Sequence, residues 1–209
     1  MNDLKGIFIT FEGIEGSGKS TQVRMLVDAF EKHGIAYLCT REPGGTEISE
    51  AIRSILLNPQ FESMKPETEL LLYCASRAQH TGELILPALA DGKVVVCDRY
   101  YDSTYAYQGA ARELDEELID TLTKFVTYGR VPDITFLIDL PVEIGLARIQ
   151  GRNLDRLEKE TTEFHQRVRQ QFLSIANKCP FRYFVLNGSE DAVSIHQQIF
   201  TMVQSLLGE

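Results

Sequence analysis

Five short apolar runs recur along the chain, and longer stretches with helical spacing separate each run from the next. Nearly continuous apolar runs rich in β-branched and aromatic residues are typical of parallel strands that are buried on both faces. Their alternation with helices predicts an open α/β sheet. No repeat or linker interrupts the pattern, so a single domain over residues 1–209 is expected. The runs span residues 6–11, 35–40, 93–98, 134–140 and 181–186.

The charge balance restricts the partners of such a domain. The 209 residues include 21 Lys and Arg against 30 Asp and Glu, which gives a net charge of −9. Nucleic acid polymers and anionic membranes favour a basic surface, so the composition argues against both as partners. An anionic small molecule remains compatible, because a small ligand responds to the local charge of its site.

Several features predict a cytoplasmic protein. The N-terminal segment lacks a basic region before its apolar stretch, which stops at Glu12, so we expect no signal peptide. No apolar run approaches the roughly 20 residues that a membrane helix needs. The four cysteines stand singly, which predicts buried thiols in a reducing compartment and argues against disulfides or a zinc site.

The first apolar run leads into the segment Gly13-Ile-Glu-Gly-Ser-Gly18-Lys19-Ser20, which fits the phosphate-loop pattern G-x-x-x-x-G-K-[ST]. Its glycines allow backbone N–H groups to face phosphate oxygens at a helix N-terminus. Lys19 would reach the β- and γ-phosphates, and the Ser20 hydroxyl would ligate Mg²⁺. A P-loop NTPase fold that binds a nucleoside triphosphate is therefore expected. The expected nucleotide contacts are Gly13, Ile14, Glu15, Gly16, Ser17, Gly18, Lys19, Ser20 and Thr21.

Glu15 is unusual inside such a loop, because a carboxylate among phosphate ligands is repelled unless a cation or a hydroxyl compensates it. Its side chain either lies in solvent on the outside of the turn or pairs with a sugar hydroxyl or a mobile arginine. The residues alone favour neither alternative.

Charged residues mark the ends of two further apolar runs. Asp98 ends the third run, where many phosphate-loop proteins hold an acid that organises magnesium, and Arg99 follows it. Arg41 comes directly after the second run. Ligands of open α/β sheets bind outside the carboxyl ends of the strands, so these side chains are expected around one crevice with Ser20. This arrangement favours a site for two phosphate groups.

Arg148, Arg152 and Arg156 recur at intervals of four, which on a helix would place them on one face. Gly151 and Asn153 interrupt the segment, and this favours a hinged flap over a rigid helix. A closing flap can bring guanidinium groups to a phosphoryl group in transfer. The alternative is an ordinary row of solvated arginines.

Two groups of polar and aromatic residues are weaker indications of a binding site. Tyr73 and Arg77 lie four residues apart in the helical stretch 66–90, where they could stack on a base and donate to its carbonyl. Taken alone, these two residues fit core packing and a surface charge better. A second cluster contains Thr104, Tyr107 and Gln108.

Distinctive motifs stand along the chain at Phe11-Glu12-Gly13-Ile14-Glu15-Gly16, Thr40-Arg41-Glu42-Pro43-Gly44-Gly45-Thr46, Asp98-Arg99-Tyr100, Ser103-Thr104, Ala106-Tyr107-Gln108-Gly109 and Leu154-Asp155-Arg156-Leu157-Glu158. Together these motifs resemble bacterial thymidylate (dTMP) kinases over essentially the whole chain. The phosphate loop fits many enzymes, whereas its combination with the other motifs is much more specific. In some relatives phenylalanine stands at the position of Tyr73, and the aromatic face is retained here.

The resemblance implies a doubly wound fold with a five-stranded parallel sheet, helices on both faces and a lid at about residues 148–160. It implies a homodimer that transfers the γ-phosphoryl group of ATP to dTMP, with Mg²⁺, to give dTDP. The alternatives are a kinase for another nucleoside monophosphate, or a phosphate-loop nucleotide switch or ATPase. Neither the dimer face nor roles for Arg53 and Arg148 follow from the sequence.

The resemblance also implies individual roles. Tyr73 would stack on thymine, Arg77 would donate to its carbonyl, and Thr104 would read the pyrimidine edge. Tyr107 would exclude a 2′-hydroxyl. The implied catalytic residues are Lys19, Arg99, Glu15, Arg152 and Arg156. The implied substrate contacts are Arg41, Tyr73, Arg77, Asp98, Arg99, Thr104, Tyr107 and Gln108, and the implied magnesium ligands are Ser20 and Asp98.

Overall fold

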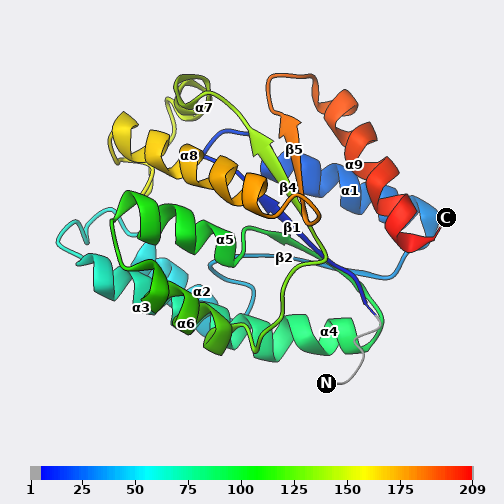
Figure 1. The fold of residues 1–209 in the computed structure, drawn as a ribbon, viewed down its shortest axis with the longest axis horizontal. Coiled ribbons are helices and arrows are strands. Elements are labelled where there is room, and N and C mark those ends of the chain that lie inside the picture. The colour runs from blue at the N-terminus through cyan, green and yellow to red at the C-terminus, as the bar shows by residue number, and fades with distance from the viewer. Residues whose placement is uncertain (1–5, 209) are drawn as a thin grey trace.

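The five apolar runs form one parallel sheet with the strand order β2-β3-β1-β4-β5 in the computed structural model, which describes residues 6–208 (Figure 1). The predicted five-stranded parallel sheet is confirmed. The chain passes from β1 to one side of the sheet and later from β3 to the other, so the order reverses at the centre. Ligands bind at such a switch point. The strands are β1 (Phe8–Glu12), β2 (Tyr37–Arg41), β3 (Val94–Asp98), β4 (Ile134–Asp139) and β5 (Tyr183–Asn187).

Helices cover both faces of the sheet (Figure 1). Several begin at a side-chain cap, as where the Thr161 hydroxyl accepts from the Phe164 N–H, and α1 ends at Gly34 in the left-handed conformation. The α-helices are α1 (Lys19–His33), α2 (Glu47–Leu56), α3 (Pro66–His80), α4 (Leu86–Ala90), α5 (Tyr101–Thr104), α6 (Glu116–Val126), α7 (Val142–Ile149), α8 (Thr162–Lys178) and α9 (Ala192–Leu207), with π-helical segments η1 (Thr81–Ile85) and η2 (Tyr105–Ala111).

Side chains of the central strands alternate between two apolar layers. Ile9 and Phe11 face α1 and α9, whereas Phe8 faces η1 and α4. Leu137 of β4 packs toward α8 and η2. The three central strands are buried on both faces as predicted, but the edge strands β2 and β5 are partly exposed.

The predicted helical stretch 66–90 is helical throughout, but it changes its hydrogen-bonding pattern at η1. Pro87 near its C-terminal end has no N–H to donate to the preceding turn, and a π-helical turn lies directly before α4. The second π-helical segment, η2, carries Tyr107 and Gln108.

The prediction of buried thiols is correct for Cys74 and Cys97 and wrong for the other two cysteines. Cys39 is exposed because β2 is an edge strand, and Cys179 is exposed because it follows the end of α8. Among the described residues, no helix is long and apolar enough to cross a membrane. Residues 1–5, which entered the prediction about a signal peptide, lie outside the described residues.

Candidate active site

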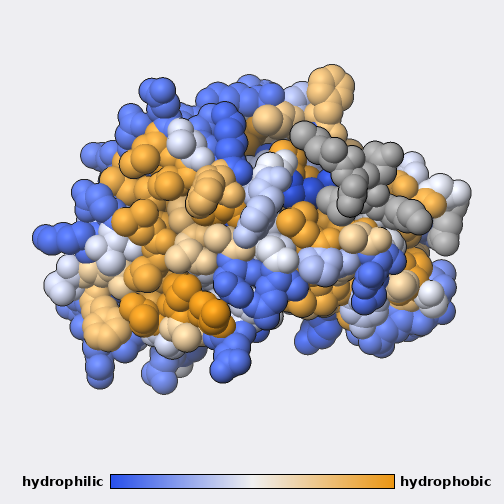
Figure 2. Space-filling view, turned by 90° about the horizontal axis from the view of Figure 1, so that it is seen from below, coloured by the Kyte–Doolittle hydropathy of each residue, from blue (hydrophilic) through white to orange (hydrophobic). Residues whose placement is uncertain are grey.

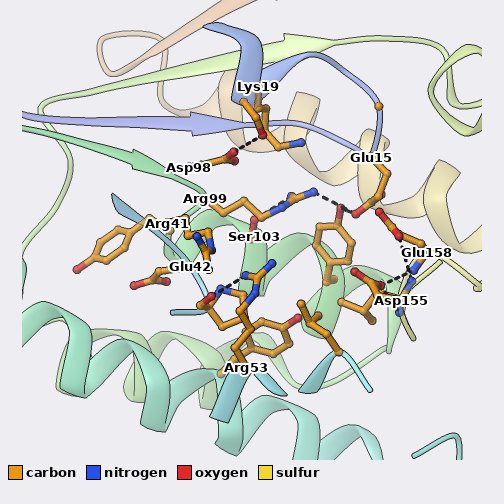
Figure 3. A pocket seen from close by; sticks show the side chains of 18 of the residues that line it. Glu15, Lys19, Arg41, Glu42, Arg53, Asp98, Arg99, Ser103, Asp155 and Glu158 are labelled. Carbon is orange, nitrogen blue, oxygen red and sulfur yellow. Dashed lines mark hydrogen bonds and ion pairs between the residues drawn. The ribbon is translucent and has the colours of Figure 1, made fainter. Parts of the chain in front are cut away.

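A cavity of about 570 Å³ opens at the carboxyl ends of β1, β2 and β3 (Figure 3). The strand register places Arg41 beside Asp98 and Asp98 beside Phe11, so the residues that end these strands share one edge. The phosphate loop, α3, η2 and the lid (residues 148–160) complete the wall. The predicted site residues that line the cavity are Glu15, Gly16, Gly18, Lys19, Ser20, Thr21, Arg41, Tyr73, Arg77, Asp98, Arg99, Thr104, Tyr107, Gln108 and Arg152.

The phosphate loop is held against α7 by close backbone contact. A Cβ at Gly16, whose φ is +68°, would lie 2.2 Å from the carbonyl oxygen of Gly145, and a Cβ at Gly145 would lie 2.5 Å from the carbonyl oxygen of Glu15, so both positions require glycine. Three predicted nucleotide contacts lie on the inner side of the loop and do not line the cavity: Gly13, Ile14 and Ser17.

Lys19 bends back over this loop. Its ammonium donates to the carbonyl oxygens of Gly13 and Ile14 at 2.9 and 2.8 Å, and it is nearly buried. Burial and the neighbouring charge of Arg99 lower the pKa of Lys19 to about 8. The ammonium therefore lies next to the loop that would hold a phosphate, and an anionic ligand there would stabilise its positive charge.

Ser20 and Asp98 form an oxygen donor pair at the mouth of the loop. The Ser20 hydroxyl donates to Oδ2 of Asp98 at 2.8 Å (Figure 3). No group of three or more His, Cys, Asp or Glu within residues 6–208 could hold a metal. A hydroxyl and one carboxylate suit Mg²⁺ nevertheless, because this ion is commonly bound by one or two protein oxygens, substrate phosphates and water.

Arg99 takes an uncommon backbone conformation directly after β3. Its φ of +70° is rare for a residue with a Cβ, and such strain concentrates at functional sites. Its guanidinium points toward Glu15, whose Oε1 accepts from Arg99 at 3.0 Å and from the Tyr107 hydroxyl at 2.5 Å (Figure 3). The Glu15 side chain is only 10% exposed. Of the two alternatives, the solvated position is therefore absent, and the arginine partner is the fixed Arg99.

Arg77 and Thr104 meet on the opposite wall. The Arg77 side chain is fully buried, and it donates to the Thr104 hydroxyl at 2.8 Å and to Glu42 at 2.7 Å. His80 contacts the other oxygen of Glu42 at 3.0 Å. Tyr73, one turn earlier on α3, lines the cavity beside them. The predicted base-recognition residues are thus brought together, and buried groups fix Arg77 in place.

The lid arginines lie in different environments. Arg152 lines the cavity and pairs with Glu158, and its side chain is 54% exposed. Arg156 does not line the cavity; its buried guanidinium contacts Glu69 at 2.6 Å and donates to the Leu56 carbonyl at 2.9 Å. The helix ends at Ile149, so the fourfold spacing of these arginines does not place them on one face.

Glu69 of α3 also binds the predicted substrate residue Gln108 and anchors Arg112 of the following segment. Gln108 donates to Oε1 of Glu69 at 2.8 Å, and Arg112 contacts Oε2 at 3.1 Å. Glu69 is 1% exposed. This buried carboxylate therefore joins α3, η2 and the lid.

For several further residues in or next to the cavity, the sequence predicted no role. Arg53 donates to the Pro43 carbonyl at 2.6 Å, and Arg148 donates to the Gly16 carbonyl at 3.1 Å. His165 of α8 approaches Glu15 from outside the cavity. The fourfold arginine spacing drew attention to Arg148, but no sequence signal marked its partner, and none marked His165. Additional lining residues are Glu42, Ser103, Asp155 and Glu158.

Comparison with known proteins decides the family. The family model described as thymidylate kinase matches residues 11–199. The chain belongs to the thymidylate kinase family. It is 48% identical over 206 residues to the thymidylate kinase of Carboxydothermus hydrogenoformans, covering 98% of this chain and 100% of that one. It is 50% identical over 205 residues to the thymidylate kinase of Pseudomonas fluorescens, covering 98% of each.

A solved structure agrees with this thymidylate kinase assignment. The crystal structure of thymidylate kinase from Ehrlichia chaffeensis superposes with a TM-score of 0.78 at 37% identity, covering 95% of this chain and 98% of that one. The predicted resemblance and P-loop fold are therefore confirmed. The predicted activity, an ATP-dependent kinase reaction that converts dTMP to dTDP, is confirmed at the level of the family.

Proposed function

We propose that the cavity holds ATP on the phosphate loop and dTMP against α3 and η2, and transfers the γ-phosphoryl group in line between them. The observation that carries this proposal is the position of Arg99. Its guanidinium contacts the phosphate loop at Glu15, and it lines the same cavity as Arg77 and Thr104. One cationic group can therefore contact both phosphates at the point of transfer.

Recognition of the acceptor uses the buried wall. The Tyr73 ring stacks on the thymine base, while Arg77 donates to a base carbonyl and Thr104 reads the pyrimidine edge. Tyr107 is nearly buried and leaves little room beside the sugar, so it excludes a 2′-hydroxyl. Gln108, fixed by Glu69, lies on the same wall. The neighbouring buried partners keep these groups in position before the substrate binds.

Catalysis is mainly positioning and charge stabilisation. A phosphate oxygen of dTMP attacks the γ-phosphorus, the bond to the β-phosphate bridging oxygen breaks, and ADP leaves. Lys19 and Arg99 contact the equatorial oxygens, and Arg152 joins them from the lid as water is excluded. Arg156 anchors the lid through Glu69. Arg41, half-exposed at the mouth, attracts the acceptor phosphate.

Magnesium fits the donor pair of Ser20 and Asp98. When bound there, Mg²⁺ would neutralise charge on the ATP phosphates. Asp98 also accepts the Ser20 hydroxyl proton in a hydrogen bond, which fixes that hydroxyl at the N-terminus of α1. Direct measurement of Mg²⁺ binding by calorimetry, with and without a non-hydrolysable ATP analogue, would compare the protein with an Asp98→Asn variant.

A coupled assay with ATP tests the proposal on dTMP, dUMP, UMP, CMP, AMP, GMP and thymidine. We expect clear preference for dTMP, and we expect Lys19→Met and Arg99→Ala each to lower turnover about 10²–10³-fold while the circular dichroism spectrum is kept. Preference for another acceptor would refute the substrate assignment. Slow ATP hydrolysis without transfer to any acceptor would indicate a nucleotide switch instead.

We further propose a homodimer in the cytoplasm. The packed helices α2, α3 and α6 carry large exposed apolar side chains, and Figure 2 shows apolar surface gathered over this region. An apolar patch of this kind marks an interaction site on a protein surface. Sedimentation at the mass of one chain, or unchanged mass in Phe125→Asp, would contradict this face. The exposed apolar side chains of this face are Ile48, Ile55, Leu71, Leu118 and Phe125.

The cytoplasmic location is supported by the cysteines, because the four free thiols suit a reducing compartment.

A further inference from the structure

His165 is a buried imidazole that the reaction proposed above does not use. It lies in the first turn of α8, four residues after the N-cap Thr161, and it is 1% exposed. Its neighbours Phe164 and Val168 belong to the apolar layer, so the helix presents this polar side chain to the interior as well. Burial of an imidazole is costly unless its nitrogens find new polar partners, because both nitrogens lose water.

The imidazole approaches the phosphate loop at one atom. Nδ1 of His165 lies 3.1 Å from Oε2 of Glu15. Within residues 6–208, neither the ring nitrogens of His165 nor Oε2 of Glu15 make a well-aligned hydrogen bond, so two buried polar groups face each other at this distance. Glu15 is therefore the partner toward which His165 is directed, across the boundary between α8 and the phosphate loop.

Glu15 divides its two oxygens between different partners. Oε1 accepts from Arg99 and from the Tyr107 hydroxyl, while Oε2 faces His165. Burial alone would raise the pKa of Glu15, but contact with His165 and the charges of Arg99 and Lys19 hold it well below its ordinary value. The terminal torsion of a glutamate is broad and roughly twofold, so a carboxylate held at one oxygen only can turn away from its partners.

We propose that His165 is a positioning residue for phosphoryl transfer: it holds Oε2 of Glu15 and thereby keeps Oε1 on Arg99 and Tyr107. The proposal rests on the roles given above to Arg99 and Tyr107. Loss of the imidazole frees the carboxylate to rotate away from the Arg99 guanidinium and the Tyr107 hydroxyl. Arg99 and Tyr107 then lose their shared anchor.

Two substitutions separate the hydrogen-bonding atom from the ring. His165→Phe keeps an aromatic ring and removes both nitrogens, whereas His165→Asn places its amide nitrogen near the position of Nδ1. We expect His165→Phe to lower kcat about 10–100-fold and to raise the KM for dTMP, with little change in the KM for ATP. His165→Asn should recover most of this loss. His33→Phe, an exposed histidine on α1, is the matched control and should behave as the unmodified protein.

NMR signals of the Glu15 carboxyl and the Arg99 guanidinium at neutral pH give a readout that a purely structural role would not move. If His165 holds the carboxylate, both signals should shift in His165→Phe and return in His165→Asn, because the contact between Glu15 and Arg99 is lost and then restored. Unshifted signals in a folded His165→Phe protein would overturn the proposal. The charged and titratable groups facing Glu15 are Lys19, Arg99, Tyr107 and His165, with Arg152 and Glu158 lining the cavity from the lid.

A double-mutant cycle with Glu15→Gln distinguishes this proposal from the one on which it rests. If His165 acts through Glu15, His165→Phe should cause little further loss in the Glu15→Gln background. Losses that multiply would overturn the inference, as would a folded His165→Phe enzyme with normal kinetics. Normal kinetics in Glu15→Gln alone would instead refute the role of Glu15. If His165→Phe does not fold, His165→Gln replaces it, because its amide nitrogen reaches the Nε2 position, and activity equal to that of His165→Asn then refutes the proposal.

Discussion

Replacement of Arg152 or Arg156 by methionine should separate the catalytic role proposed for Arg152 from the anchoring role of Arg156. The fourfold spacing in the sequence does not distinguish these two roles. Methionine keeps much of the apolar stem and removes the guanidinium. Arg156→Met removes the 2.6 Å contact with Glu69 and the hydrogen bond to the Leu56 carbonyl, both buried. Arg152→Met removes only a pair with Glu158, in which the arginine side chain is 54% exposed. The first change should lower stability, and the second should lower turnover.

The expected sizes follow from burial. Removal of one partner from a buried ion pair costs about 3–5 kcal/mol. Glu69 keeps Arg112 and Gln108 as partners, so we expect a loss at the lower end of this range, about 3 kcal/mol, for Arg156→Met. For a chain of this length that corresponds to a fall in Tm of about 6–12 °C. The exposed pair of Arg152 contributes below about 1 kcal/mol. If Arg152 stabilises the transferring phosphoryl group, its loss should lower kcat about 10²–10³-fold.

Urea unfolding followed by circular dichroism, paired with a coupled dTMP kinase assay at 25 °C, measures both quantities on the same preparations. Arg152→Met should unfold near the midpoint of the unmodified protein and show the large loss of kcat. Arg156→Met should unfold at lower urea and retain a larger kcat than Arg152→Met. A Glu69→Gln background provides the control, because the cost of Arg156→Met should shrink there by about 1–3 kcal/mol.

The reverse pattern would refute this reasoning. If Arg156→Met kept full stability and lost turnover as severely as a phosphate-binding arginine, its contact with Glu69 would not describe the working enzyme, and Arg156 would be the catalytic group. Equal and full activity in Arg152→Met would remove Arg152 from the site. Additive costs of Arg156→Met and Glu69→Gln would show that the two side chains do not stabilise the fold through each other.

Two further predictions concern buried groups. Burial and the charge of Asp102 raise the pKa of Glu12 to about 7 from an ordinary 4.5. The folded protein therefore binds this proton more tightly than the unfolded chain does. Its free energy of unfolding should fall by about 3 kcal/mol as the pH rises from about 4.5 through about 7. Glu12→Gln should flatten the dependence in urea titrations between pH 5 and 8, and an unchanged slope would contradict it. Tyr107→Ala should raise the kcat/KM of UMP relative to dUMP, which differ only at the 2′-hydroxyl, by about tenfold. Tyr107→Phe keeps the bulk and should not; an unchanged ratio in Tyr107→Ala would place the gate elsewhere.

The fold was predictable because each strand is marked by a local apolar run in the sequence. The central runs are apolar on both sides, and the phosphate loop ties the first strand to the first helix. The same local rule located Lys19, Asp98 and Arg99, since position after a strand determines that a side chain reaches the carboxyl edge. Exposure of Cys39 was not predictable in this way, because the sequence does not reveal which strand lies at the edge of the sheet.

Arginine partners were not predictable, because they are set by contacts between distant segments. Arg156 and Glu69 are far apart in the chain, and helical spacing carried no information about their contact. His165 gave no signal for the same reason: its position next to Phe164 in an apolar helix fits an ordinary core histidine, and only the fold brings it to Glu15. The resemblance identified the lid but could not divide its arginines between anchor and catalyst.

Some of the acidic residues that give the chain its negative charge hold the arginines around the cavity in place. Each buried arginine around the cavity is held by a carboxylate: Glu15 holds Arg99, Glu42 holds Arg77, and Glu69 holds Arg156. A buried pair gains little net stability, because desolvation offsets much of its Coulomb attraction. What it provides is a fixed cation, and groups fixed before the reaction need no reorganisation when charge develops on the phosphoryl oxygens. The acids that lower the net charge to −9 therefore include those that organise the site for anions.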